Sequence, residues 1–214
     1  MIRLIIFIIL FMTSNASASA IEAFDGSALK PDGSPSAWML KVKSGTPKLV
    51  KAIDGSTPAL CLNSADASFS IQRDIELDIN KYPFVTWRWR ANVLPPKGDM
   101  RNSSTDDQAA QMVVAFGGKY ALDYIWDTNA PIDTEGDFYV PFVVTAKILV
   151  IANKQNKLQE WMEVTRDLRK DYRRLFGKDP GNISGLRFQV NSQHTESIAE
   201  GCISRITFHD QPKP

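Results

Sequence analysis

The sequence predicts a mainly β protein, an antiparallel, jelly-roll-like β-sandwich of about ten strands with one amphipathic helix. Three observations lead to this prediction. Short runs that alternate apolar and polar residues recur along the chain, and turn-forming residues separate them. Helical periodicity stands out in one segment, residues 166–176. No strand–helix–strand rhythm is present, which argues against a doubly wound parallel sheet.

The expected strands share a period-two pattern and end close to turn signals. Asp54-Gly55 and Gly117-Gly118 are two of these signals, because such pairs favour tight hairpin turns. The expected strands are residues 38–42, 48–53, 59–63, 68–73, 84–92, 111–116, 121–126, 146–152, 186–191 and 202–208. The chain shows no internal repeat and no low-complexity linker, so residues 21–214 are expected to form a single domain.

The expected helix has its apolar residues on one face. They are Leu168, Tyr172, Leu175 and Phe176, which follow the spacing of a helical stripe. Thr165 is the expected N-cap, and Gly177 suits the C-terminal end. The other face is rich in arginine and lysine, which is typical of a solvated helix surface. Binding to an anionic surface is the alternative.

Composition excludes several classes of protein. The chain has 214 residues, of which 43% are hydrophobic, with 25 Lys+Arg against 24 Asp+Glu. Such a chain is neither disordered nor collagen-like, and two cysteines do not make a disulfide-dense scaffold. The near-neutral balance gives no indication of a nucleic-acid partner.

The N-terminus resembles a secretory signal peptide. Arg3 precedes an apolar run at residues 4–12, and alanines at 16, 18 and 20 form small-residue cleavage patterns. We therefore expect residues 1–20 to be removed and the protein to be exported, either periplasmic or secreted. The run is too short for a membrane span, so none is expected in the mature chain. An uncleaved N-terminal anchor is the alternative.

Export changes the interpretation of the two cysteines. Cys61 and Cys202 both lie in strand-like segments, and an oxidising compartment permits a disulfide between them. Two buried free thiols are the alternative, because pairing depends on a distance that the sequence does not contain. No nearby histidine gives a zinc spacing, and no metal site is expected.

Alternation predicts a polar face rich in arginine and amides. In residues 84–92 we expect Trp87 and Trp89 to enter the core, which turns Arg88 and Arg90 to the opposite face. The outward residues of other strands would extend this face if the strands share one sheet; they are Asp123, Arg187, Gln189 and Asn191, with Ser68, Ser70 and Gln72. Guanidinium and amide groups suit sugar hydroxyls and carboxylates, although any antiparallel sheet can have one wet face.

The long loop before residue 111 contains Asp106 and Asp107. We expect these carboxylates to form ion pairs with Arg88 or Arg90. Calcium coordination and acid–base chemistry are the alternatives. Adjacent residues on an extended chain point to opposite sides, so the two make a poor catalytic pair with each other.

Taken together, these motifs resemble a family of exported bacterial proteins that carry a domain of unknown function. The matching motifs are Tyr82-Pro83, Trp87 to Arg90, Asp106-Asp107, Tyr124 to Trp126, Trp161, Arg166-Asp167, Asp171-Tyr172, Phe176-Gly177 and Ile203 to Phe208. The resemblance implies a β-sandwich similar to carbohydrate-binding jelly rolls and implies no known activity. Asn191-Ser192-Gln193-His194-Thr195 departs from the family's Asp-x-Asp-Asn-Thr pattern, which puts a calcium or acid role there in doubt.

Two functional classes fit these features. The first is a non-catalytic binder of a glycan or other anionic ligand, because no nucleophile elbow or phosphate loop is present. No cofactor and no catalytic residue are expected in that case. The alternative is a hydrolase or lyase that acts on a cell-envelope polysaccharide, with Asp106 or Asp107 beside an arginine.

Overall fold

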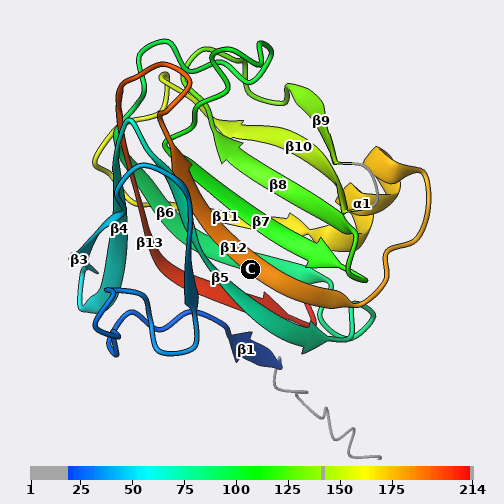
Figure 1. The fold of residues 1–214 in the computed structure, drawn as a ribbon. Coiled ribbons are helices and arrows are strands. Elements are labelled where there is room, and N and C mark those ends of the chain that lie inside the picture. Colours follow the sequence, from blue (N-terminus) through cyan, green and yellow to red (C-terminus); the bar gives the residue numbers. More distant parts are fainter. Residues whose placement is uncertain (1–18, 141–142, 213–214) are drawn as a thin grey trace, which may run out of the picture.

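Two β-sheets pack face to face in the computed structural model, which describes residues 19–140 and 143–212 (Figure 1). The predicted signal peptide, residues 1–20, lies outside the described residues except for Ser19 and Ala20. Over the described ranges, thirteen strands and one helix are present. The predicted jelly-roll-like β-sandwich with an amphipathic helix is therefore confirmed. No helix in this part of the chain has the length and apolar character that a membrane crossing needs.

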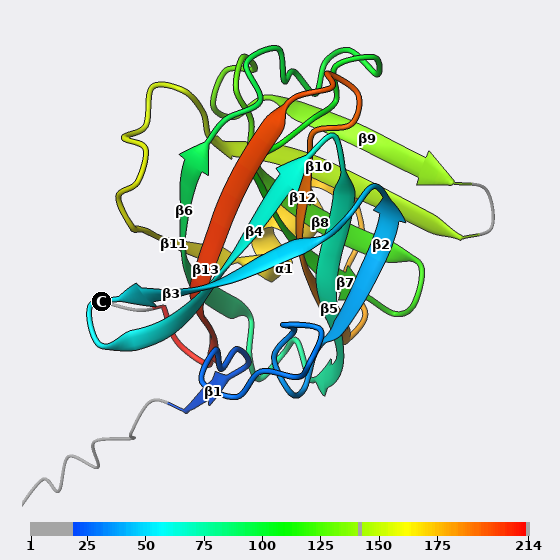
Figure 2. The same cartoon turned by 60° about the vertical axis from the view of Figure 1, so that its left-hand side comes forward.

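One sheet has six strands, and Figure 2 brings it forward. Its order is β11 (Met162–Asp167), β6 (Phe84–Val93), β13 (Ile198–His209), β4 (Thr57–Ala65) and β3 (Lys48–Asp54). The short strand β1 (Ala20–Glu22) pairs with the last residues of β13. All the strand pairs of this sheet are antiparallel. We call it the six-stranded sheet.

The other sheet has seven strands. Its order is β2 (Met39–Ser44), β5 (Ser68–Leu77), β12 (Ile183–Asn191), β7 (Ala110–Phe116), β8 (Tyr120–Trp126), β10 (Val144–Ala152) and β9 (Glu135–Val140). The pair β8–β10 is parallel, and the remaining pairs are antiparallel. We call it the seven-stranded sheet.

Every expected strand overlaps an observed one, whereas β1, β9 and β11 were not predicted. β1 has three residues, too few to show a pattern. The strands β9 and β11 lie at sheet edges; β9 carries no clear alternation, whereas β11 alternates only over the short stretch Met162–Thr165. Tertiary pairing, and not local propensity, makes these segments strands.

Aromatic side chains from both sheets meet in the core. Trp87 and Trp89 of β6 are fully buried, as predicted, and so are Tyr124 and Trp126 of β8. The ring centroids of Trp87 and Tyr124 lie 5.2 Å apart, and those of Trp89 and Trp126 lie 5.7 Å apart. Such contacts add about 0.5–1.5 kcal/mol each beyond the apolar area that they bury.

The helix α1 (Leu168–Phe176) starts later than predicted. The expected N-cap, Thr165, is wrong, because Thr165 still belongs to β11 and its Oγ1 lies 2.8 Å from that of Thr86. Asp167 caps the helix instead by accepting a hydrogen bond from the backbone N–H of Lys170. Gly177 ends the helix in the left-handed conformation that its lack of a side chain permits.

A buried polar triad holds α1 against the sandwich. Arg166 donates two hydrogen bonds to Asp171, at 2.7 and 2.6 Å, and the Tyr124 hydroxyl donates a third at 2.8 Å. Burial raises the pKa of Tyr124 well above its usual value, so its hydroxyl stays protonated as a donor. Arg166 itself belongs to β11. The arginines of α1 lie on its predicted solvated face, where Arg173 and Arg174 pair with Asp179 and Glu135.

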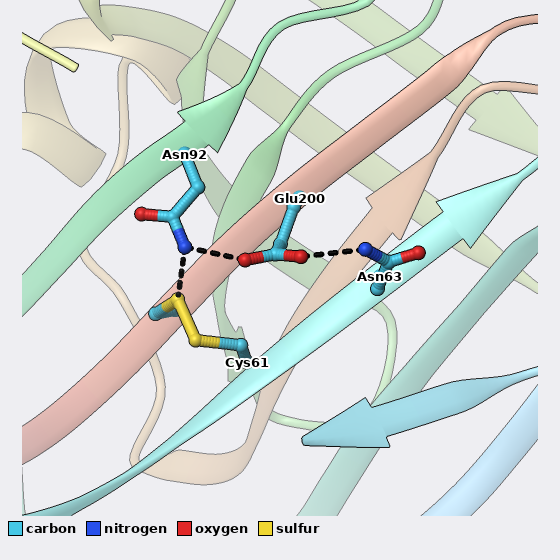
Figure 3. The surroundings of a disulfide bond; sticks show 5 residues. Cys61, Asn63, Asn92 and Glu200 are labelled. Carbon is cyan, nitrogen blue, oxygen red and sulfur yellow. Dashed lines mark hydrogen bonds between the residues drawn. A yellow bond between two sulfur atoms is a disulfide. The ribbon is translucent and has the colours of Figure 1, made fainter. Parts of the chain in front are cut away.

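A disulfide joins Cys61 of β4 to Cys202 of β13, at directly paired positions of the six-stranded sheet. Glu200 accepts hydrogen bonds from Asn63, at 2.5 Å, and from Asn92 beside the disulfide (Figure 3). These contacts link β4, β13 and β6 across the face that carries the disulfide.

We expect loss of the disulfide to lower the free energy of unfolding strongly. The two cysteines lie 141 residues apart, and closing so long a loop stabilises by up to about 5 kcal/mol in the chain-entropy model. Denaturant unfolding of a Cys61→Ala/Cys202→Ala variant measures the loss. Dithiothreitol should destabilise the wild type and leave the variant unchanged. If the wild type and the variant were equally stable without dithiothreitol, the prediction would be wrong.

Candidate functional site

A groove of about 680 Å³ runs across the outer face of the seven-stranded sheet. Residues from β2, β5, β12, β7, β8, β10 and β9 line it, together with loop residues that include Asp106, Gln108, Lys119 and His194. In Figure 1 these strands lie side by side on the face turned toward the reader. The groove is large enough for a ligand of several sugar rings.

Strand alternation sets the outer face of this sheet. In β12, Leu186, Phe188 and Val190 are buried in the core, so Arg187, Gln189 and Asn191 face outward. In β8, burial of Leu122, Tyr124 and Trp126 likewise turns Asp123 outward. All four of these outward residues line the groove.

Residues in register form three rows across the groove. The middle row is Gln72, Arg187, Val113, Asp123 and Ile148. One neighbouring row is Ser70, Gln189, Gln111 and Ile125, and the other is Asp74, Gly185, Ala115, Ala121, Ala146 and Phe138. One side of the floor is therefore rich in amides, whereas the other is apolar and ends at Phe138, which is 48% exposed.

The predicted ion pairs of Asp106 and Asp107 with Arg88 or Arg90 are wrong. Asp107 is fully buried and accepts hydrogen bonds from the backbone N–H and the hydroxyl of Thr195, both at 2.7 Å. The backbone N–H of His194 and the side-chain amide of Asn191 donate to it as well, at 3.2 Å each. Donors from residues 191, 194 and 195 therefore satisfy this carboxylate where we expected arginines, and the His194 Nδ1 atom also lies 3.2 Å from it.

The amide of Asn191 joins the same network to the groove. Its oxygen accepts from the Gln111 side chain at 2.6 Å and from the backbone N–H of Gln108 at 3.1 Å, while its nitrogen donates to the carbonyl of Asp106 at 2.6 Å. His194 Nδ1 lies 2.9 Å from that same carbonyl. The network holds Asp106 and His194 at the rim.

Two carboxyls with raised pKa face the groove. Burial raises the pKa of Asp106, which accepts one hydrogen bond from Gln108 at 2.7 Å. Burial raises the pKa of Asp123 to about 7, and one of its carboxylate oxygens is buried without a hydrogen-bond partner in the described ranges. An unsatisfied buried carboxyl in a groove is typical of a functional group.

Arg88 and Arg90 lie on the opposite side of the molecule. They belong to β6 of the six-stranded sheet, so they do not share a face with Arg187, as we had expected if the strands formed one sheet. Arg88 is paired with Asp54 at 2.6 Å, and the Arg90 guanidinium lies 4.8 Å from the ring centre of Trp161. The structure thus brings together Asp106, Asp123, Arg187, Gln189 and Asn191, with Asp107 buried behind them.

Several groove residues were not predicted from the sequence, and three of them show why. Gln111 faces outward in a predicted strand, so the alternation along that strand could have placed it on the polar face. Phe138 belongs to the edge strand β9, which carries no clear alternation. His194 reaches the groove through its loop, and no local pattern indicates this.

Metal-binding side chains do not converge in this groove. Over the part of the chain that the structure describes, the group with suitable spacing is Cys61, Glu200 and Cys202, and a disulfide joins its two sulfurs. The Asp107 oxygens already accept hydrogen bonds from the surrounding loop.

We expect Asp123→Asn to stabilise the protein at alkaline pH. The pKa of Asp123 is higher in the folded state than in the unfolded chain, so the free energy of unfolding falls as the pH rises from about 4 to about 7. The substitution should raise that free energy by roughly 4 kcal/mol at about pH 8 and change it little at about pH 4.

Denaturant unfolding at both pH values tests this expectation. Asp66→Asn is the matched control, because Asp66 is exposed beside the turn between β4 and β5. If Asp123→Asn stabilised the protein equally at both pH values, the raised pKa would not belong to Asp123.

Comparison with solved structures finds similar folds. The xyloglucanase domain of NopAA, an effector from Sinorhizobium fredii solved in complex with cellobiose, matches with a TM-score of 0.50 and 7% identity over 82% of this chain and 93% of that chain. An endoglucanase from Rhodothermus marinus gives 0.49 and 8% identity over 91% and 100%. A family 11 carbohydrate-binding module from Clostridium thermocellum gives 0.46 and 10% identity over 90% and 95%.

Comparison with curated proteins finds no match. A family model does match residues 43–207, which include the groove strands except most of β2, and most of the six-stranded sheet. The chain therefore belongs to DUF3047, a family described as protein of unknown function.

Proposed function

We propose that this protein binds a glycan in the groove of the seven-stranded sheet. The observation that carries the proposal is the groove itself, which places an apolar floor beside convergent amide and guanidinium groups. Ligand sites commonly combine apolar surface with a few placed polar groups. A sugar ring has the same two properties, with apolar faces and hydroxyl groups around its edge.

Two parts of the groove match these parts of a sugar. The low row that includes Ala115, Ala121 and Ala146 leaves room above the sheet, and the exposed ring of Phe138 can stack against a sugar face. On the other side, Gln72 and Gln189 offer amide donors and acceptors to hydroxyl groups. A domain with this fold has been solved with cellobiose, which accords with the proposal.

We also propose that the protein acts outside the cytoplasm. Residues 1–20 have the pattern of a signal peptide, and the Cys61–Cys202 disulfide is the kind of bond that persists in oxidising compartments. A glycan of the cell envelope or its surroundings would be accessible there. Mass determination of the mature protein tests the cleavage: a retained residue 1 would contradict it.

We expect Arg187→Ala to weaken glycan binding and Arg90→Ala to leave it unchanged. Loss of charge-assisted hydrogen bonds costs about 1.5–3 kcal/mol, which corresponds to about 10- to 100-fold in the dissociation constant. A glycan array identifies the ligand, and isothermal titration calorimetry measures each variant. The two substitutions are matched in type but lie on opposite sheets.

The reverse result would place the site elsewhere. If Arg90→Ala abolished binding and Arg187→Ala did not, the ligand would lie on the six-stranded sheet. Thermal unfolding of both variants shows that the folds are intact. The absence of binding to any glycan on the array would contradict the proposal as a whole.

One observation favours a hydrolase as a second candidate. Asp106 and Asp123 both line the groove, and burial raises the pKa of each, as general acid chemistry on a glycosidic bond requires of one carboxyl. Asp107, which the sequence also offered for this role, is buried, and its carboxylate accepts hydrogen bonds from Thr195.

We expect such a hydrolase to release reducing ends from a polysaccharide that it binds. Asp123→Asn and Asp106→Asn would each lower that rate by about 100-fold or more, because general acid–base groups contribute about that much. A reducing-sugar assay with the bound polysaccharide measures it, and Asp66→Asn serves as the control. A bound polysaccharide that stays intact for days would remove this candidate.

A further inference from the structure

We infer that the glycan recognised in the groove is acidic, a polymer or oligomer of uronic acid, held between Arg187 and Asp123. This inference rests on the proposed glycan binding and names the substrate class. Two observations carry it. An arginine and a carboxyl lie two strands apart on the floor of one groove, and neither has an ionic partner there within 4 Å in the described ranges.

Arg187 supplies the recognition of a carboxylate. Its hydrogen bond to Gln72 is a long one, from Nη2 to Oε1 at 3.3 Å, and its side chain is exposed to the groove. The remaining guanidinium donors form the planar fork that binds a carboxylate with two parallel hydrogen bonds. By contrast, Arg88 and Arg166 already make such bonds within the protein.

Asp123 supplies the second contact. One of its carboxylate oxygens is buried and unsatisfied, and the side chain lines the groove floor. As a neutral acid it can donate a hydrogen bond to a sugar oxygen or to the carboxylate of the ligand. As an anion it would repel that carboxylate across a low-dielectric floor.

The spacing of the two groups suits a single sugar ring with its substituents. Arg187, Val113 and Asp123 are in register on three successive strands, so the outer two Cα atoms lie roughly 9–10 Å apart. Val113 between them presents an apolar surface against which a ring can rest. A uronate lying across Val113 would direct its carboxylate to Arg187 and another oxygen to Asp123.

The surrounding charges favour an anionic ligand once Asp123 is neutral. Over β10, the neighbours of Asp123 are Ala146 and Ile148, which carry no charge. The basic groups that line the groove are Lys43, Arg73, Lys119 and Arg187, with the titratable His194 at the rim, and the acidic groups are Asp74, Asp106 and Asp123. Protonation of Asp123 therefore leaves an excess of positive charge.

Calorimetry with matched acidic and neutral ligands tests the inference. The probes are oligomers of galacturonate, mannuronate and glucuronate, each beside its own methyl ester, which keeps the ring and removes the charge. We expect one acid to bind at least about tenfold more tightly than its ester, and Arg187→Ala to abolish that preference.

The pH dependence of binding isolates the role of Asp123. The ligand carboxylate stays ionised, so affinity should fall by about tenfold between about pH 6 and about pH 8 as Asp123 loses its proton. Asp123→Asn, whose amide still donates a hydrogen bond, should bind with no such pH dependence. His194→Gln, the control for the imidazole at the rim, should retain it.

The outcomes separate this inference from the proposed function. If esters or neutral glycans bind as tightly as the acids, and Arg187→Ala weakens both, the acidic ligand is wrong while glycan binding stands. If Asp123→Asn keeps the full pH dependence, the assignment of the proton to Asp123 is wrong. If neither acidic nor neutral glycans bind, both proposals fail.

Discussion

The packing of β6 against β8 is the contact on which the rest of the structure depends. Trp87 and Trp89 enter the space between the sheets and meet Tyr124 and Trp126. Large aromatic side chains bury too much apolar area to be turned outward at acceptable cost. Because a strand has a period of two, burying these rings decides the direction of every neighbouring side chain on both strands.

The same constraint produces the groove and its chemistry. Tyr124 and Trp126 can be buried only if Asp123 and Ile125 face the other way, so the unsatisfied carboxyl of Asp123 is a consequence of core packing on β8. Arg187 follows by the same logic from Phe188 and Leu186 on β12. An acid kept buried without a partner costs stability, and such costs persist in proteins mainly where function requires them.

The rim of the groove depends on a different kind of interaction. Asp107 is buried, and the donors that satisfy it come from residues 194 and 195, far along the chain. A buried carboxylate with several hydrogen bonds holds two loops rigidly, because breaking any one bond leaves an unsatisfied charge. This clamp, together with Asn191, positions Asp106 and His194 beside the sheet.

The sequence alone determined the fold class, the approximate strands, the inward direction of Trp87 and Trp89 and the outward direction of Asp123, Arg187, Gln189 and Asn191, because alternation is a local property of the chain. Only the tertiary structure decided which strands share a sheet. That choice separates Arg88 and Arg90 from Arg187, and it brings His194 and Phe138 to the groove. Strand partners and loop contacts depend on pairing between residues far apart in the chain, and the pattern within one strand contains no record of its neighbours.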